Sequence, residues 1–208
     1  VMNDTAALTN YAASASHVEF AGTVTRVNQA VTSVYYRGFT NFYGVDVLRI
    51  SVNDLGNSGA DGMLLVNGSV PISVYAMNDA PQWISFPASL TVSEDQPLNF
   101  SLSFTDVDTL PGLLFQVQLQ VGSGRLIVRP ESLAGVSLVL GSSANASFLA
   151  FTGTLVNVND ALLALTFLAP NNYYGTTWLQ ANVSDFGNVG IGGVLSGVAN
   201  GTLSVSPV

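Results

Sequence analysis

The chain has 208 residues, of which only 9% are charged, and its formal net charge is −8 with five lysine and arginine residues. So few basic side chains argue against nucleic acid or an anionic membrane surface as a partner, because both are bound through lysine and arginine. The absence of cysteine excludes a Cys/His dyad and a cysteine-based zinc cluster. No run approaches the roughly 18 apolar residues of a membrane span, so none is expected.

Hydrophobic periodicity predicts mostly strands. In chain order, residues 27–34 fit one or two helical turns, alternation predicts strands over 98–104 and 115–121, residues 158–165 again fit a short helix, and a further strand covers 179–183. Turn residues lie between them, at Asp108–Gly112, Gly122–Gly124, Asn171–Asn172 and Gly187–Gly193. Short alternating strands at this spacing predict an antiparallel β-sandwich with one short helix per unit.

The sequence also repeats itself. Residues 16–59 align without a gap with residues 147–190, at an offset of 131 residues. The identical pairs include Phe20/Phe151, Gly22/Gly153, Thr23/Thr154, Asn28/Asn159, Asn41/Asn172, Gly44/Gly175, Leu48/Leu179, Val52/Val183, Asp54/Asp185 and Gly56/Gly187. After a further shift of two residues, Asn67 aligns with Asn200. The chain is therefore predicted to be a tandem array with a period near 130 residues.

The extent of the repeat divides the chain into a partial unit, a linker and a complete unit. Residues 82–208 read as one complete unit, residues 78–81 as a linker, and residues 1–77 as only the later part of a unit. The first segment lacks the strands that residues 82–131 supply to the second. We expect it to be completed either by residues of the same polypeptide upstream of Val1 or by strands from a neighbouring subunit.

Six short motifs of the full unit stand in a fixed order. They are Asn78-Asp79-Ala80-Pro81, Val92-Ser93-Glu94-Asp95, Phe104-Thr105-Asp106-Val107-Asp108, Phe151–Leu155 with Asn159–Leu162, Asn172–Gly175 and Val183–Asn188. In this order they resemble the cadherin-like or Ig-like tandem repeats of giant secreted and cell-surface proteins. The resemblance implies an all-β fold of tandem antiparallel β-sandwiches, the first incomplete, acting as non-enzymatic extracellular rods that are often stiffened by calcium. Two features depart from the pattern: the last strand ends at Ser204–Val208 without an acidic residue, and the unit exceeds a plain cadherin domain in length.

A calcium site at the junction is the first candidate site. In an antiparallel sandwich the second strand returns to the pole where the linker enters, which places Asp106 and Asp108 near Asp79, and the penultimate strand brings Asp185 to the same pole. Glu94, on the first strand, completes the predicted set. A hard cation that takes six to eight oxygen ligands suits such a cluster. The alternative is that these aspartates only stabilise turns.

N-linked glycans are the second candidate, if the source is a eukaryote. Sequons occur at Asn3, Asn67, Asn99, Asn145, Asn182 and Asn200. Asn99 and Asn182 fall on the polar phase of their strands, so we expect them to face outward. Sequons at Asn67 and Asn200 recur in both units, and the alternative is that each marks a hairpin Asn-Gly turn.

Signals for catalysis are weak. The single histidine, His17, aligns with Phe148 and fits a packing position on a strand, and Asp106 and Asp108 are too close in sequence to flank a glycosidic bond. An aromatic set could instead stack on sugars: Tyr35, Tyr36, Phe39, Phe42, Tyr43, Tyr173, Tyr174 and Trp178.

The sequence therefore predicts a structural unit of an extracellular filament, sheath or long adhesin, with identical subunits or adjacent repeats as partners. The alternative is a carbohydrate- or surface-binding adhesion module. No signal peptide is recognisable from Val1 onward, so we expect any such segment upstream.

Overall fold

The computed structural model describes residues 16–57, 62–140 and 146–208 of the chain. The chain divides into two units, Val1–Thr40 and Asn41–Val208. The described part of the first unit, residues 16–40, contains the helix α1 (Val24–Val31), in which no residue is buried. Thr23 caps this helix by accepting a hydrogen bond from Arg26 N through its side-chain oxygen.

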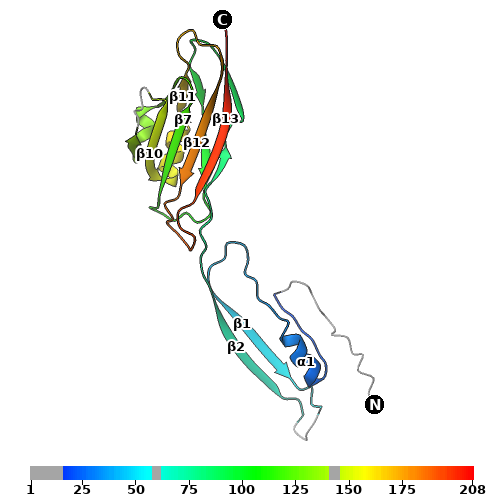
Figure 1. The fold of residues 1–208 in the computed structure, drawn as a ribbon. Coiled ribbons are helices and arrows are strands. Elements are labelled where there is room, and N and C mark those ends of the chain that lie inside the picture. Colours follow the sequence, from blue (N-terminus) through cyan, green and yellow to red (C-terminus); the bar gives the residue numbers. More distant parts are fainter. Residues whose placement is uncertain (1–15, 58–61, 141–145) are drawn as a thin grey trace. The chain divides into compact units, whose positions relative to one another are not determined.

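The second unit holds the remaining elements, which are β1 (Gly44–Asn53), β2 (Leu65–Val74), β3 (Gln82–Ser85), β4 (Ser89–Ser93), β5 (Leu98–Phe100), β6 (Ser103–Thr105), β7 (Leu114–Val121), β8 (Arg125–Val128), η1 (Pro130–Leu133), β9 (Val136–Leu140), β10 (Phe148–Thr154), α2 (Leu155–Leu162), β11 (Leu165–Leu168), β12 (Gly175–Ser184) and β13 (Ser196–Ser206). Strands β1 and β2 form a two-stranded antiparallel sheet of their own, and β3 to β13 form the sandwich (Figure 1).

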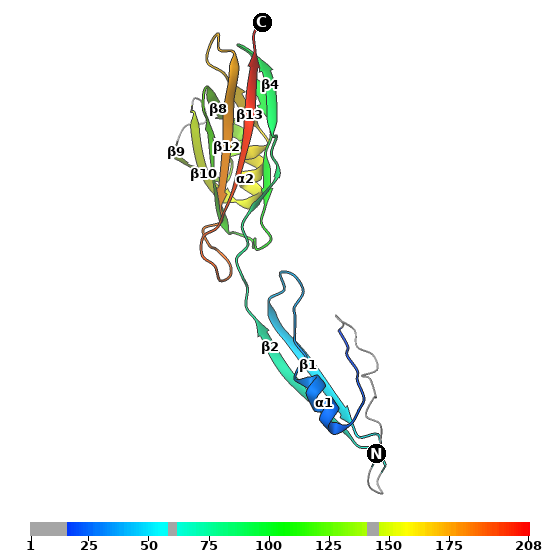
Figure 2. The same ribbon diagram turned by 45° about the vertical axis from the view of Figure 1, so that its right-hand side comes forward.

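The sandwich has one large sheet and two small ones. The large sheet has the strand order β4-β13-β12-β7-β10-β9, and the smaller sheets are β5-β11-β8 and β3-β6. Among the described strands of the sandwich, every pairing is antiparallel except that of β13 with β4. In Figures 1 and 2, β12 and β13 run side by side through the large sheet, and α2 lies on its inner side. The fold is thus an all-β sandwich with one short helix, as the sequence predicts.

Alternating burial supplies the core. Every second residue of β7 is buried, beginning with Phe115, while Gln116 and Gln118 are partly buried and Gln120 is exposed. Strand β12 buries Leu179, Ala181 and Val183 in the same way. The predicted strands over 115–121 and 179–183 are confirmed. Helix α2 buries Val158, Ala161 and Leu162, although it begins three residues earlier than the apolar pattern predicts because Thr154 caps its N-terminus.

Two predictions about strands are wrong. Residues 98–104 do not form one strand, because β5 pairs with β11 whereas β6 pairs with β3, so the chain changes sheet between them. His17 does not lie on a strand either: its side chain is exposed and lies 4.0 Å from the Glu19 carboxylate. Its counterpart Phe148 pairs with β7, and residues 16–77 contain no equivalent of β7.

The repeat is visible in the elements themselves. Helices α1 and α2 occupy equivalent positions, and hairpins β1-β2 and β12-β13 share one register, since Gly44 pairs with Val74 and Gly175 with Val205. Equivalent residues also share positive φ angles, at Asn41/Asn172, Gly44/Gly175, Leu55/Phe186 and Gly56/Gly187. The offset of 131 residues therefore extends from the helices to the ends of both hairpins.

The shared register overturns the two-residue shift inferred from the sequons. Asn67 pairs with Ser51, whereas Asn200 pairs with Gln180, so the two asparagines are not equivalent. Neither Asn-Gly pair forms a hairpin turn, because both lie within long strands. A shift of two residues keeps a side chain on the same face of a strand, and both Asn67 and Asn200 are exposed.

Candidate functional site

The structure brings four aspartates together where the linker meets the sandwich. Asp79 precedes β3 and Asp106 follows β6, and these strands pair at Gln82 and Thr105. Asp108 Oδ2 accepts a hydrogen bond from Asp79 N at 2.6 Å, and Asp108 N donates to Asp106 Oδ1 at 2.8 Å. These hydrogen bonds show that Asp79, Asp106 and Asp108 lie close together, as the strand directions predict.

Asp185 holds the loop after β12 and is 2% exposed. Its Oδ1 accepts hydrogen bonds from Gly187 N at 2.7 Å and Leu195 N at 2.9 Å. Its Oδ2 accepts one from Asn78 Nδ2 at 2.6 Å, and the same amide donates to Gly193 O at 2.7 Å. Both carboxylate oxygens are therefore engaged by the protein, and Asn78, which the sequence marked as part of the linker motif but not as a site residue, ties the linker to this loop.

Asp54 repeats half of this arrangement. Its Oδ1 accepts hydrogen bonds from Gly56 N at 2.9 Å and from Leu64 N at 2.8 Å. These contacts, that from Leu64 first, lower the pKa of Asp54 below its ordinary value. Because Asp54 and Asp185 clamp equivalent loops, the turn-stabilising interpretation accounts for Asp185.

Asp106 is the electrostatic exception in the cluster. It is 6% exposed, and its Oδ2 is a buried atom with no hydrogen-bond partner. Burial raises the pKa of Asp106, and the carboxylates of Asp108, Asp185 and Asp79 raise it further, against the stabilising N–H of Asp108. Buried polar atoms are nearly always hydrogen-bonded, so an unpartnered carboxylate oxygen among other carboxylates is a position suited to a cation.

The fit to a calcium ion is incomplete in the described residues. No group of three or more histidine, aspartate or glutamate side chains there is arranged to hold a metal. Asp79, Asp106 and Asp108 are the candidates that remain once Asp185 is assigned to its loop. Backbone carbonyls and water would have to supply the other ligands, as they commonly do for calcium.

Glu94 does not join the cluster. It follows β4, whose last residue pairs with Ser206 at the far end of the 11-residue strand β13. Glu94 N donates to Ser206 O at 2.8 Å, and Glu94 Oε1 accepts from Val208 N at 3.0 Å. Since Asp185 N is hydrogen-bonded to Leu195 O just before β13 begins, about 30 Å of strand separates Glu94 from the aspartates. The inclusion of Glu94 in the predicted set is wrong because the first strand runs away from the linker, which carries its last residues to the opposite end of the sandwich.

Four of the predicted sequons lie in the described residues. The side chains of Asn67, Asn99 and Asn200 are exposed. Asn182 is half-buried on β12, between β13 and β7, and its Oδ1 is a buried atom without a hydrogen-bond partner. Asn182 points away from the core residues of β12, as predicted, but its side chain is only partly accessible to solvent. Asn3 and Asn145 lie outside the described residues.

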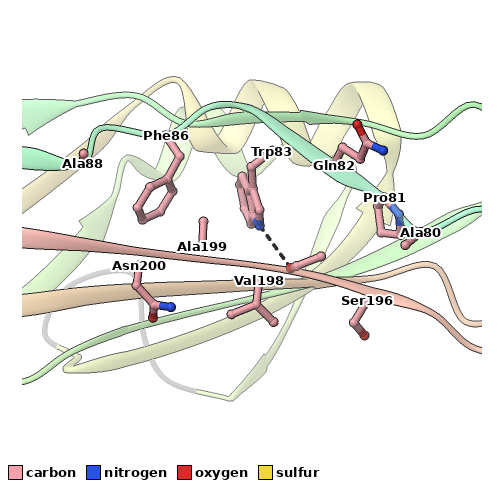
Figure 3. A pocket seen from close by; sticks show the side chains of 11 residues that line it. Ala80, Pro81, Gln82, Trp83, Phe86, Ala88, Ser196, Val198, Ala199 and Asn200 are labelled. Atoms are coloured by element: carbon pink, nitrogen blue, oxygen red, sulfur yellow. Dashed lines mark hydrogen bonds between the residues drawn. The ribbon is translucent and has the colours of Figure 1, made fainter.

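The aromatic set is mostly exposed. Exposed members are Tyr35, Tyr36, Phe39, Phe42, Tyr43, Tyr174 and Trp178, whereas Tyr173 packs against the core. None of the exposed members lines the groove of about 590 Å³ that runs between β3 and β13. In Figure 3, Trp83 and Phe86 point from the β3 side toward β13, and Trp83 Nε1 donates to Gly197 O at 3.1 Å. The groove has no charged side chain, and so carries no acid–base chemistry.

Comparison with known proteins adds little beyond this description. Neither the protein-family models nor the curated proteins give a match. Among solved structures, the chain is similar to the seventh ScaB type I cohesin of Pseudobacteroides cellulosolvens, with 10% identity and a TM-score of 0.38 over 62% of this chain and 94% of that one. It is also similar to mouse cadherin-23 EC22-24, with 18% identity and a TM-score of 0.37 over 79% and 43% of the two chains. These likenesses are too distant to carry an argument about function. No described helix is long and apolar enough to cross a membrane.

Proposed function

We propose that the chain is a structural repeat unit of an extracellular filament, sheath or long adhesin, built from tandem β-sandwiches that share strands between repeats. The observation that supports this proposal is which strands form in residues 16–77. These residues correspond to the later half of the repeat, and the strands described there are β1 and β2, which pair with each other.

Hydrogen-bond partners explain which elements form. Residues 17–23 correspond to β10, which pairs with β7 and β9, and residues 34–37 correspond to β11, which pairs with β5 and β8. Neither stretch is a strand. Residues 16–77 contain no counterpart of β5, β7 or β8, which belong to the early half of the repeat, and the counterpart of β9, residues 5–9, lies outside the described residues. In contrast, β1 and β2 pair with each other over their full length. The segment thus has the structure of a sandwich without its early half.

The open half exposes the residues that would form a core. Leu48, Ile50 and Val52 on β1 are 41%, 44% and 57% exposed. Their equivalents on β12 are at most 1% exposed, namely Leu179, Ala181 and Val183. Apolar surface gains about 25 cal/mol per Å² on burial, so contiguous exposed residues of this kind favour association with a complementary surface.

Sedimentation velocity of the full chain over a concentration series tests the proposal. We expect the mass to rise above the 21.7 kDa of the monomer as concentration increases. Ile50→Asp should shift association to at least tenfold higher concentration, because it places a charge on the exposed apolar face. Val198→Asp, at an exposed position on β13, is the matched control and should change nothing. A wild-type chain that stays monomeric at every concentration would contradict assembly through this face.

We further propose that the acidic cluster binds calcium and that the exposed sequons carry glycans when the protein is secreted by a eukaryotic cell. The unpartnered Oδ2 of Asp106 supports the first, and its test is described in the Discussion. The sparse surface charge supports the second, since glycans would keep an apolar surface soluble.

Glycan occupancy should follow side-chain exposure. In protein secreted from a eukaryotic host, we expect higher occupancy at Asn67, Asn99 and Asn200 than at Asn182, because the Asn182 amide is partly enclosed by neighbouring strands. Mass spectrometry of glycopeptides, with peptides from deglycosylated protein as reference, gives the occupancy of each site. Full occupancy at Asn182 with none at the exposed sites would contradict the expectation.

A further inference from the structure

We propose that the free edge of β1, from Leu48 to Asn53, is a docking edge for an incoming antiparallel strand of the β7 type, supplied by another polypeptide that carries the same repeat. A β7-type strand is one with the pattern of Leu114–Val121, in which apolar residues alternate with glutamine. This inference rests on the proposed function and names the partner and the side from which it binds. Docking of a strand to an exposed sheet edge is an established mode of recognition.

The complete repeat supplies the template. Strand β12 pairs with β13 at one edge and with β7 at the other, from Leu179 opposite Val121 to Ser184 opposite Gln116. Strand β1 is the equivalent of β12 in register, length and flanking backbone geometry. Yet its only partner in the described part of the chain is β2. The edge that β7 occupies in the sandwich is therefore the edge of β1 that lacks a strand.

Backbone direction identifies the groups available at this edge. In the sandwich, Trp178 O accepts a hydrogen bond from Gly122 N at 3.0 Å, so the main chain at this position faces β7. Alternate residues face the same way, which places the N–H and C=O groups of Arg49, Ser51 and Asn53 at the free edge. The equivalent of Trp178 is Val47, whose N–H is already bound by Asp46 Oδ1 at 2.7 Å. The open ladder thus begins after Val47.

The other edge of the hairpin is less suitable. In the sandwich, Thr202 N donates to Ala88 O at 3.0 Å, next to the parallel pairing of β13 with β4. The equivalent of Thr202 is Pro71, because Val47 pairs with Pro71 as Trp178 pairs with Thr202. Proline has no N–H, so a strand approaching the outer edge of β2 loses this hydrogen bond. The hairpin is therefore open toward a β7-type strand and obstructed toward a β4-type strand.

Side chains on β1 match the donor pattern. The apolar residues of β7 lie opposite the core-facing residues of β12, and β1 offers Leu48, Ile50 and Val52 at those positions. The glutamines of β7 lie opposite polar residues, and β1 offers Arg49, Ser51 and Asn53 there. The chain's own β7 is paired at both edges, by β10 and β12, so it is not free to dock. The donor must come from a polypeptide whose early-half strands are not already paired.

A peptide probe tests the docking edge on the full chain. The probe is a fluorescent synthetic peptide with the sequence of Leu113–Gly122 and added lysines for solubility. We expect saturable binding by fluorescence anisotropy and slower amide hydrogen exchange at Arg49, Ser51 and Asn53. In β7, Val121 N faces β10 and Gly122 N faces β12, so N-methylation at Gln118 and Gln120 should weaken binding at least tenfold. N-methylation at Val117 and Leu119 removes as many N–H groups from the opposite edge and should have less effect.

Proline variants of the chain provide the reciprocal test. Ser51→Pro removes an N–H from the free edge of β1 without removing a β1-β2 hydrogen bond, and should weaken peptide binding at least tenfold. Ser69→Pro alters the outer edge of β2 in the same way and should leave binding unchanged. Absence of binding, binding that is sensitive only to Ser69→Pro, or self-association that Ser51→Pro abolishes while the peptide does not bind would each overturn the inference.

These outcomes can be separated from those of the proposed function. If the chain self-associates but neither binds the peptide nor responds to Ser51→Pro, the filament proposal survives and the docking edge is wrong. If the peptide binds at β1 while the chain alone stays monomeric, the docking edge is supported and self-assembly of this chain is wrong.

Discussion

Asp106→Asn should stabilise the metal-free chain at pH 7, by about 1–3 kcal/mol in the free energy of unfolding. The wild-type carboxylate has a buried oxygen without a hydrogen-bond partner among three other aspartates, and an unsatisfied buried group costs about this much. An asparagine keeps an acceptor for the N–H of Asp108, removes the charge, and adds a donor toward the neighbouring carboxylates. Urea denaturation in the presence of EDTA measures the difference. The exposed Asp160→Asn is the control for loss of one negative charge.

The effect should depend on pH in a defined direction. Because burial raises the pKa of Asp106 above its ordinary value of 3.8, the folded chain binds more protons than the unfolded chain between those two pKa values. The contribution of Asp106 to stability therefore falls as pH rises through that window. Asp106→Asn should thus have little effect below the ordinary value and its full effect above the raised one. A difference that is constant across this range would contradict a destabilising charge on Asp106.

Calcium should reverse the sign of the substitution. If an ion binds through Asp79, Asp106 and Asp108, free calcium at 100 times its Kd stabilises the wild-type chain by about 2.7 kcal/mol. Asp106→Asn should lose most of this gain, whereas Asp160→Asn should retain it. Equal stability of the wild-type chain in calcium and in EDTA would contradict the calcium proposal, and would leave Asp106 as a buried charge that the fold tolerates.

The sequence predicted most where local pattern and local structure coincide. The alternation in Phe115–Val121 and Leu179–Val183 correctly predicts burial on one face, and the offset of 131 residues relates the two helices, and the two hairpins that the structure adds, to each other. The pole of the sandwich at which Asp79, Asp106 and Asp108 meet followed from strand direction alone, since consecutive antiparallel strands return to the same end.

The errors arose where tertiary partners decide the outcome. Residues 98–104 alternate without interruption, yet the strand breaks because its two halves pair with different sheets. His17 has the pattern of a strand residue, but its neighbours lack the strands that pair with Phe148. The sequence carried one signal for the loop contacts of Asp185, since Asp54 and Gly56 align with Asp185 and Gly187 across the repeat. It carried none for the contact of Asp185 with Asn78 or for the unpartnered oxygen of Asp106, because both aspartates follow a strand and differ only in their tertiary partners.

The repeat offers a matched pair of core substitutions with a large expected difference. Phe151→Ala should destabilise the sandwich by about 3–5 kcal/mol, because Phe151 is fully buried on β10 and its removal leaves a cavity. Its equivalent Phe20 lies in a stretch that is not a strand and is only partly buried. Phe20→Ala should therefore change the free energy of unfolding by less than about 0.5 kcal/mol. Far-UV circular dichroism follows the whole chain, and fluorescence of Trp83 and Trp178 follows the sandwich alone.

The same pair also reports completion of the first unit. When an early-half partner closes residues 16–77 into a sandwich, Phe20 takes the place that Phe151 has in the complete repeat, and Phe20→Ala should then weaken the complex by an amount similar to the cost of Phe151→Ala. We therefore expect Phe20→Ala to have a larger effect in the complex than in the isolated chain, because the free-energy cost of deleting an aromatic ring depends on how well the ring is packed. A cooperative transition in the isolated chain that Phe20→Ala lowers as strongly as Phe151→Ala would mean that residues 16–77 already close a core of their own, and the need for a donated strand would disappear.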